Sequence, residues 1–256
     1  VNTTKGKFLF RIAPFSDFNN EVAASRLLEG KINTPKLLYH CTNNVGNVFI
    51  YQYIDGVSLQ KLIIDNNGCK PEYIRQVAKT AAVLHNTPLR DTADLQELDV
   101  PPYELWYELF LSVPALKDRL GGELYKKLTC FIKDNENLIA EIDKFQSFIH
   151  SDFRPANMLV NKQNEVYFVD WEYACTGHSL GDIGQFFRYA SYFTKADIEL
   201  FEREYNSYAN VKLPDNWFDL ARFRDLINPM QMLPYGQGSS RRCQDLIQVV
   251  REIISL

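Results

Sequence analysis

Four polar residues in the second half of the chain have types and a spacing that suit phosphoryl transfer. His150, Asp152 and Asn157 form the pattern H-x-D-x-x-x-x-N, and Asp170 follows Asn157 by 13 residues at the end of an apolar stretch. In this chemistry one carboxylate accepts the proton of the attacking hydroxyl group. A second carboxylate and an amide oxygen hold Mg²⁺ against the nucleotide phosphates. The pattern therefore predicts a magnesium-dependent phosphotransferase site.

The segment Phe148–Tyr189 resembles the catalytic core of the aminoglycoside phosphotransferase and choline kinase family, which shares the protein kinase-like fold. The resemblance implies that Asp152 is the catalytic base and that Asn157 and Asp170 are the metal ligands. It also implies that Asp182, within the run LGDIG, braces the backbone of the catalytic loop.

Three further residues of this segment can be compared with the family pattern. His150 is expected to be structural, as Asp182 is. Trp171 stands where protein kinases have the Phe of D-F-G, a departure that small-molecule kinases of this family tolerate. Arg154 follows Asp152 by two residues. It either contacts the transferred phosphoryl group or forms a salt bridge within the loop.

The resemblance extends toward the N-terminus. Arg11, in the strand-like run KFLFRI, falls where the family has a basic residue over the nucleotide phosphates, and Glu21 is the expected ion-pair partner. The run YQYIDG is similar to the hinge that carries adenine through backbone hydrogen bonds, which assigns nucleotide binding to Gln52, Tyr53 and Ile54.

One part of the family pattern has no counterpart here. The family places a strand pair and a loop over the nucleotide phosphates before the strand that bears the basic residue. This chain begins about ten residues before Arg11 and contains no G-x-G-x-x-G. Either this chain lacks its natural start or the lobe is trimmed, and in both cases we expect the N-terminal lobe to lack the first strand and the phosphate loop.

The elements that must position these residues divide into two lobes. Residues 1–54 predict a small strand-rich nucleotide-binding lobe, with strands at Lys7–Ile12, Lys36–His40 and Asn47–Tyr53 and a helix at Asp17–Glu29. The Asp55-Gly56 pair ends the last of these strands. Residues 55–256 predict a helical catalytic and acceptor-binding lobe. The expected fold class is therefore α+β, a bilobal protein kinase-like fold with its ligand site in the cleft.

The second lobe is predicted to carry a short catalytic hairpin between two groups of helices. The expected helices of the first group are Ser58–Asp65, Pro71–His85, Tyr103–Lys117 and Glu123–Asp143. The expected strands that follow are Phe148–Ile149, Met158–Val160 and Val166–Val169, and helices resume from Leu180.

An acidic and aromatic interval suggests how the acceptor is bound. Residues 91–108 contain six acids, three aromatic residues and neither Lys nor Arg. Such a surface attracts an amine or quaternary ammonium group, which assigns substrate binding to Glu104, Trp106 and Glu108. The alternative is a solvated face of an ordinary amphipathic helix.

Composition excludes several other classes of protein. The 256 residues carry a formal net charge of -4, which argues against a nucleic-acid partner. A run of about 18 apolar residues, as a membrane span requires, is missing. Five cysteines far apart in sequence, with no C-x-x-C pair, argue against a disulfide framework or a zinc site and favour a reducing cytoplasm.

We therefore expect a cytoplasmic kinase that moves the γ-phosphate of ATP or GTP, with Mg²⁺, to a hydroxyl group of a small and cationic molecule. An aminoglycoside or amino sugar is the first candidate acceptor, and a choline-like amino alcohol is the second. The alternative is a non-catalytic structural or binding protein on the same kinase-like fold.

Overall fold

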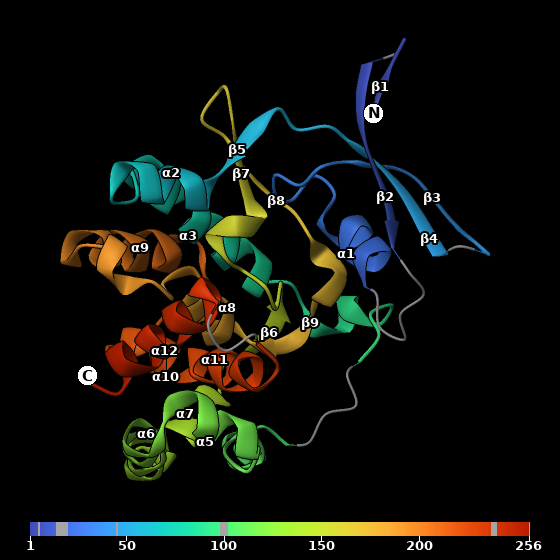
Figure 1. Cartoon of the computed structure of the whole chain (residues 1–256). Coiled ribbons are helices and arrows are strands. Elements are labelled where there is room, and N and C mark those ends of the chain that lie inside the picture. Colours follow the sequence, from blue (N-terminus) through green and yellow to red (C-terminus); the bar gives the residue numbers. More distant parts are fainter. Residues whose placement is uncertain (5, 14–19, 45, 98–101, 237–239, 256) are drawn as a thin grey trace.

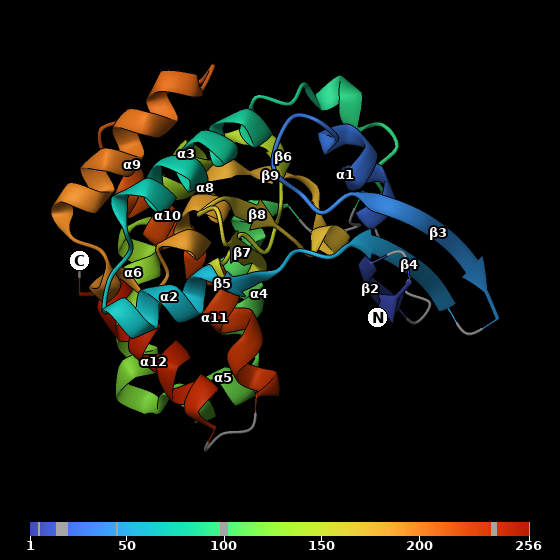
Figure 2. The same cartoon turned by 90° about the horizontal axis from the view of Figure 1, so that it is seen from above.

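The structure is a computed structural model that describes residues 1–4, 6–13, 20–44, 46–97, 102–236 and 240–255. It has a small N-terminal sheet and a larger helical part, which lie at opposite sides of the molecule in Figures 1 and 2. The fold is therefore α+β, as the sequence predicted.

The N-terminal sheet is antiparallel, with the strand order β1-β2-β4-β3. Its strands are β1 (Asn2–Thr3), β2 (Gly6–Ala13), β3 (Leu37–Asn43) and β4 (Gly46–Gln52). Helix α1 (Glu21–Leu28) packs on the sheet around a small core of Ala13, Phe49 and Tyr51. The three predicted strands are confirmed. The predicted helix begins later than expected, at Glu21, and its positions 17–19 lie outside the described residues.

The helical part contains eleven of the described α-helices. These are α2 (Leu59–Asn66), α3 (Pro71–His85), α4 (Trp106–Leu111), α5 (Pro114–Leu120), α6 (Gly122–Asp134), α7 (Glu136–Ile142), α8 (Ser179–Phe186), α9 (Lys195–Tyr208), α10 (Trp217–Asp225), α11 (Ile227–Met232) and α12 (Arg241–Ile253). Helix α3 shows why they pack: Ile74, Val77 and Ala81 recur on one face and are fully buried. That helix packs along α9, as both views show.

Two long helices predicted from sequence are each divided in the structure. The stretch predicted at Tyr103–Lys117 forms α4 and α5, because Pro114 lacks an N–H group and disfavours helical dihedral angles at Val113, whose ψ is 112°. The stretch predicted at Glu123–Asp143 forms α6 and α7, separated by Asn135 with φ -118° and ψ 20°.

Two short sheets belong to the helical part, and one of them contains the predicted hairpin. One has the order β5-β7-β8, with β5 at Gly56–Ser58, β7 at Met158–Asn161 and β8 at Val166–Phe168. The other pairs β6 (Gln146–Ile149) with β9 (Cys175–His178). The prediction missed β5 and β9 because neither short segment has an alternating apolar pattern.

Strand β5 depends on a glycine. A Cβ atom at Gly56 would lie 2.7 Å from the carbonyl oxygen of Val160 on β7. Because real Cβ atoms do not approach that closely, a larger residue would separate the two strands. The Asp55-Gly56 pair was interpreted as a break, whereas Gly56 itself begins a strand.

The fold also bears on what the sequence predicted about membrane-spanning helices and about cysteines. In the described part of the chain, every helix is too short or too polar to cross a bilayer. All five cysteines lie in that part and carry free thiols, and Cys69, Cys175 and Cys243 are buried.

Candidate active site

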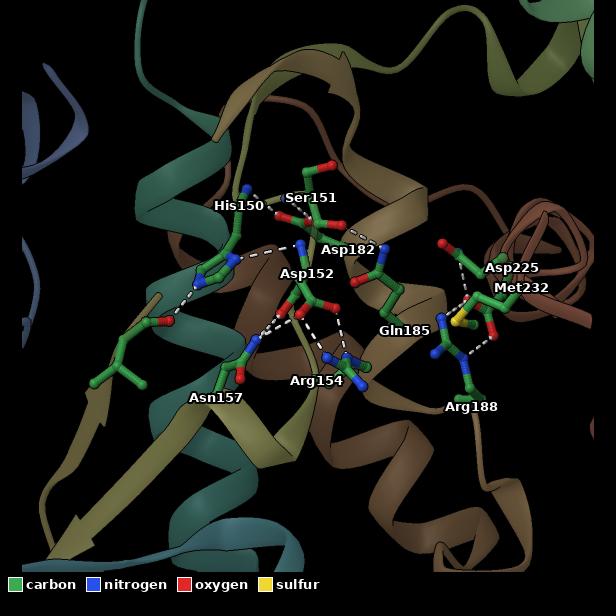
Figure 3. A network of polar contacts seen from close by, with 12 residues as sticks. His150, Ser151, Asp152, Arg154, Asn157, Asp182, Gln185, Arg188, Asp225 and Met232 are labelled. Atoms are coloured by element: carbon green, nitrogen blue, oxygen red, sulfur yellow. Dashed lines mark hydrogen bonds and ion pairs between the residues drawn. The ribbon is translucent and has the colours of Figure 1, made fainter. Parts of the chain in front are cut away.

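A loop between β6 and β7 carries the predicted catalytic residues, and one buried carboxylate holds its backbone (Figure 3). Asp182, fully buried on α8, accepts hydrogen bonds from the backbone N–H groups of His150 at 2.8 Å and Ser151 at 2.9 Å. Ser151 has φ of +68°, a region that non-glycine residues rarely adopt. The two bonds to Asp182 therefore stabilise a backbone turn that the loop sequence alone does not favour.

The His150 side chain links this loop to the end of the hairpin. Its ring Nε2–H donates to the carbonyl oxygen of Val169 at 2.9 Å, while Nδ1 accepts the backbone N–H of Asp152 at 3.3 Å. The residue is 1% exposed, and its ring lies 4.3 Å, centroid to centroid, from the ring of Trp171. His150 therefore contacts Asp152 and the two residues that flank Asp170, Val169 and Trp171, rather than solvent.

The Asp152 carboxylate lies between two donors, as Figure 3 shows. Arg154 donates to both of its oxygens, with Nη2 at 2.6 Å from Oδ2, and the Asn157 amide Nδ2 lies 2.7 Å from Oδ2. Burial opposes ionisation, but Arg154 and Asn157 outweigh it and lower the pKa of Asp152 below its ordinary value. Of the two roles left open for Arg154, this arrangement is the salt bridge within the loop.

The two predicted metal ligands lie at the open end of the β7–β8 hairpin. Met158 pairs with Phe168, and one step further the Val169 N–H donates to the carbonyl oxygen of Asn157 at 3.0 Å. Asp170 therefore follows directly beside Asn157. Since the Asn157 Nδ2 faces Asp152, its Oδ1 is directed to the other side.

A carboxylate and an amide oxygen suit Mg²⁺, which prefers oxygen ligands and takes part of its shell from substrate phosphates. The described residues contain no cluster of three or more His, Cys, Asp or Glu side chains able to hold a metal without such help. The donor set of Asn157 and Asp170 therefore fits a metal ion shared with a nucleotide.

Arg11 joins the N-terminal sheet to this hairpin. Its Nη1 donates to Glu21 Oε1 at 3.1 Å, to Glu21 Oε2 at 3.0 Å and to Asp170 Oδ1 at 3.2 Å, and its Nη2 contacts Glu172. The Tyr51 hydroxyl donates to Glu21 at 2.6 Å. Burial of Glu21 raises its pKa despite these partners. The ion pair predicted between Arg11 and Glu21 is thus present, with two additional carboxylates that bind the same guanidinium.

The predicted adenine hinge connects β4 to β5. The Gln52 backbone N–H donates to the carbonyl oxygen of Lys36 at 2.9 Å. The Tyr53 side chain is exposed, and the Lys7 ammonium lies 5.5 Å from its ring centroid. Ile54 follows in the connection before β5. Nucleotide binding by these three residues stays a prediction.

The predicted acceptor-binding residues lie on a short 3₁₀ turn, Tyr103–Leu105, and on α4. Glu104 and Glu108 are exposed. The Trp106 ring already has a cation above it, because the Arg224 guanidinium lies 5.4 Å from its centroid and 4.8 Å from that of Tyr103. Another acid of this interval, Asp99, lies outside the described residues. Substrate binding by Glu104, Trp106 and Glu108 stays a prediction.

Sequence reasoning missed two residues around Arg11. One is Glu172, whose position two residues after Asp170 was a usable signal. The other is Asn20, immediately before α1. Its side-chain Nδ2 donates to the carbonyl oxygens of Gln96 at 2.9 Å and Ala174 at 2.7 Å, and its Oδ1 accepts the Gln96 N–H at 2.7 Å.

Asn20 therefore joins three segments that are distant in sequence. Its own N–H also donates to the carbonyl oxygen of Glu172 at 3.1 Å, and the residue is 1% exposed. These bonds hold the start of α1, which carries Glu21, against the segment after Asp170. Asn20 is thus a positioning residue for the Arg11 ion pairs.

Asn20→Ala is expected to lower the free energy of unfolding by roughly 2–4 kcal/mol, because it removes the partner of the buried carbonyl oxygen of Ala174 and two hydrogen bonds to the backbone of Gln96. It should also weaken nucleotide binding, since Glu21 loses its anchor. Urea unfolding with and without Mg²⁺ and ATP measures both effects. The exposed Asn66→Ala is the control and should change stability by less than about 0.5 kcal/mol. Equal stability of both variants would contradict the role of Asn20.

Solved structures of known proteins share this fold. A spectinomycin phosphotransferase in complex with ADP and spectinomycin matches with a TM-score of 0.67 at 14% identity, covering 97% of this chain and 84% of that one. Choline kinase LicA from Streptococcus pneumoniae matches with a TM-score of 0.67 at 17% identity, covering 99% and 88%. The chain therefore has the protein kinase-like fold of small-molecule phosphotransferases.

Sequence comparison defines the family. The profile of the phosphotransferase enzyme family matches residues 1–226, so the chain belongs to that family. The match continues beyond Tyr189, the last residue of the segment that resembles the catalytic core of the family. Human ethanolamine kinase 1 is 24% identical over 207 residues, which cover 75% of this chain and 42% of that protein. The chain thus spans less than half the length of this curated relative.

Proposed function

We propose that this protein transfers the γ-phosphate of ATP or GTP to a hydroxyl group of a small molecule. The observation that carries the proposal is the convergence of Asp152, Asn157 and Asp170 at one hairpin end, with Arg11 bound to Asp170. Residues 1–54 are the nucleotide-binding lobe, and residues 55–256 are the catalytic and acceptor-binding lobe. Spectinomycin phosphotransferase with ADP and an aminoglycoside 2'-phosphotransferase with GDP support a nucleotide co-substrate.

The proposed mechanism consists mainly of positioning and charge stabilisation. Asp152 orients the acceptor hydroxyl group and receives its proton. Arg154 donates to both oxygens of Asp152, but among the described residues Oδ1 receives only this one bond, so it keeps a lone pair that can accept the proton. The Arg154 guanidinium lies beside Asp152 and therefore beside the reacting groups, where it can contact the transferred phosphoryl group.

Two further sets of residues serve the nucleotide. Arg11, ordered by Glu21, binds the phosphates. Asn157 and Asp170 would hold Mg²⁺, which neutralises the charge that develops on the phosphate oxygens. Gln52, Tyr53 and Ile54 carry the adenine, while Asp182 and His150 keep the catalytic loop in place.

Two acceptor classes are candidates. Aminoglycosides and amino sugars were ranked first from the sequence, and the likeness to a spectinomycin phosphotransferase supports them. Amino alcohols were ranked second, and human ethanolamine kinase 1 and choline kinase LicA support them. A cavity of about 190 Å³ beside Arg154 is below the roughly 300–1,000 Å³ usual for drug-sized ligands. This size favours an amino alcohol or a single sugar ring over a multi-ring acceptor.

Neutralising Glu104 and Glu108 together, as Glu104→Gln with Glu108→Gln, is expected to raise the KM of a cationic acceptor by up to about fivefold. The reason is that two exposed carboxylates attract an ammonium group with roughly 1 kcal/mol in water. The KM for nucleotide should not change, and added salt should remove the difference. Glu136→Gln on α7 is the control. An unchanged acceptor KM at low salt would contradict a role for these two acids.

The proposal is tested by nucleotide binding and by turnover. Mg²⁺ with ATP or GTP at about 100 times the dissociation constant should stabilise the fold by about 2.7 kcal/mol, measured as a thermal shift. A panel of hydroxylated amines in a coupled nucleotide-turnover assay then identifies the acceptor. The absence of stabilisation by either nucleotide would instead favour a non-catalytic binding protein on this fold.

A further inference from the structure

A cavity of about 190 Å³ opens beside the catalytic loop. Its walls come from α2, from the loop at Arg154, from the end of α8 and from the start of α12. The cavity reaches the active site through Arg154, whose guanidinium binds the carboxylate of Asp152. A molecule in this cavity is therefore next to the proposed base.

Gln185 of α8 lies in the wall of this cavity and has a buried side-chain oxygen. The side chain lines the cavity and is 6% exposed. Its Nε2 donates to the carbonyl oxygen of Ser151 at 2.8 Å, which places the amide against the residue before Asp152 (Figure 3). Among the residues that the structure describes, none donates to the buried Oε1. Buried polar atoms in native proteins nearly always have a partner, and one without a partner is a candidate ligand contact.

The charges of the cavity wall balance one another. Arg154 is paired with Asp152. Arg188 binds Asp225 through two hydrogen bonds, Nε to Oδ2 at 2.9 Å and Nη2 to Oδ1 at 2.7 Å. Neither arginine therefore offers an uncompensated charge to a ligand.

The remaining two charged residues in the wall have opposite signs. Arg241 and Asp245 lie one helical turn apart at the start of α12. In the described part of the chain, neither forms an ion pair. With no excess of either sign, hydrogen bonding must contribute most of the discrimination between ligands that enter the cavity.

We propose that Gln185 Oε1 accepts a hydrogen bond from a second polar group of the acceptor. The acceptor is then a small molecule with an N–H or O–H donor in addition to the hydroxyl group that receives phosphate. The inference deepens the proposed phosphotransferase function and rests on it. It follows from the chemistry of the amide, because an oxygen that can only accept selects a donor.

The inference predicts that kcat/KM drops at one point within a series of methylated amino alcohols. Ethanolamine, N-methylethanolamine and N,N-dimethylethanolamine each keep at least one N–H when protonated, whereas choline has none. All four carry one positive charge and one hydroxyl group. The kcat/KM should change little along the first three and fall by about tenfold from N,N-dimethylethanolamine to choline, as the loss of one hydrogen bond implies.

Two substitutions separate recognition of the acceptor from support of the catalytic loop. Gln185→Met removes the accepting oxygen and the bond to Ser151, and it should bring the ratio between N,N-dimethylethanolamine and choline to about one. Gln185→Glu keeps an accepting oxygen but loses the donor to Ser151, and it should retain the ratio. A residue that only supports the loop would lower kcat equally for every acceptor in both variants and leave the ratio unchanged.

Calorimetric binding of the same four compounds, with a non-hydrolysable ATP analogue and Mg²⁺, provides a readout that needs no turnover. If the parent binds the compounds with an N–H group more tightly than choline and Gln185→Met does not, the result supports the site. If the parent shows this preference in binding but no turnover, the phosphotransferase function alone is overturned. If the ratio between N,N-dimethylethanolamine and choline, in turnover or in binding, is the same in the parent and in Gln185→Met, the inference is overturned and the proposed function is unaffected. If none of the four compounds binds, the inference is overturned. The proposed function is then tested separately by the thermal shift that Mg²⁺ with ATP or GTP produces.

Discussion

Asp152→Asn is expected to lower kcat by a factor of at least about 100, with little change in the affinity for nucleotide. A positioned general base contributes roughly 10²–10⁴ to the rate, and an amide cannot take up the proton. Asn keeps the size of the side chain, and the Asp182 bonds that hold the loop involve the backbone of other residues. Steady-state kinetics on the identified acceptor, together with nucleotide binding, measures the two effects.

The matched control is Asp65→Asn, which removes a carboxylate of an exposed ion pair with Lys61. Such surface pairs contribute little, so its kcat should equal that of the parent. Circular dichroism and thermal unfolding verify that both variants fold. Near-normal kcat for Asp152→Asn would show that another group accepts the proton.

Asp170→Ala is expected to weaken Mg²⁺-dependent nucleotide binding by about 100-fold or more, because it removes the one carboxylate of the proposed metal site. Loss of a residue that merely supports a metal ligand already costs 10–100-fold. Nucleotide binding measured in the presence of a chelator should change much less. The fold should be less affected, since the Asp170 side chain is 40% exposed.

The backbone at this position calls for a second variant. Asp170 has φ of +70°, which Asp and Asn tolerate better than Ala does. Asp170→Asn therefore separates the loss of charge from backbone strain, and it should show the same loss of metal-dependent binding with higher stability. Asp134→Asn on α6 is the surface control. Nucleotide and Mg²⁺ binding as tight in Asp170→Asn as in the parent would exclude Asp170 as a ligand.

Local patterns were sufficient for most of the elements that carry the site. The strand that bears Arg11, the helix that begins at Glu21 and the two strands of the β7–β8 hairpin all follow from alternation or helical periodicity in short windows. The helix boundaries at Pro114 and Asn135 were predictable in principle, because those residues interrupt a helix through their own chemistry. The long periodic stretches around them concealed that signal.

Contacts between residues far apart in the chain could not be predicted from local patterns. Arg11 and Glu172 are 161 positions apart, and Asn20 and Ala174 are 154 apart, so no window of the sequence contains both members of either pair. The pairing of β6 with β9 has the same origin. Trp106 is a further example: its acidic neighbours in sequence suggested a site for a foreign cation, whereas the fold places Arg224 over the ring.

The sequence by itself determined which side chains are candidates for the proposed phosphoryl transfer, since the types and spacing of His150, Asp152, Asn157 and Asp170 carry that information locally. Only the tertiary structure decided which groups surround them. It paired Arg154 with Asp152, and it placed Gln185, whose buried oxygen has no donor among the described residues, in the wall of a cavity. The reason is physical: side-chain type depends on one position, whereas burial and hydrogen-bond partners depend on how segments far apart in the chain pack together.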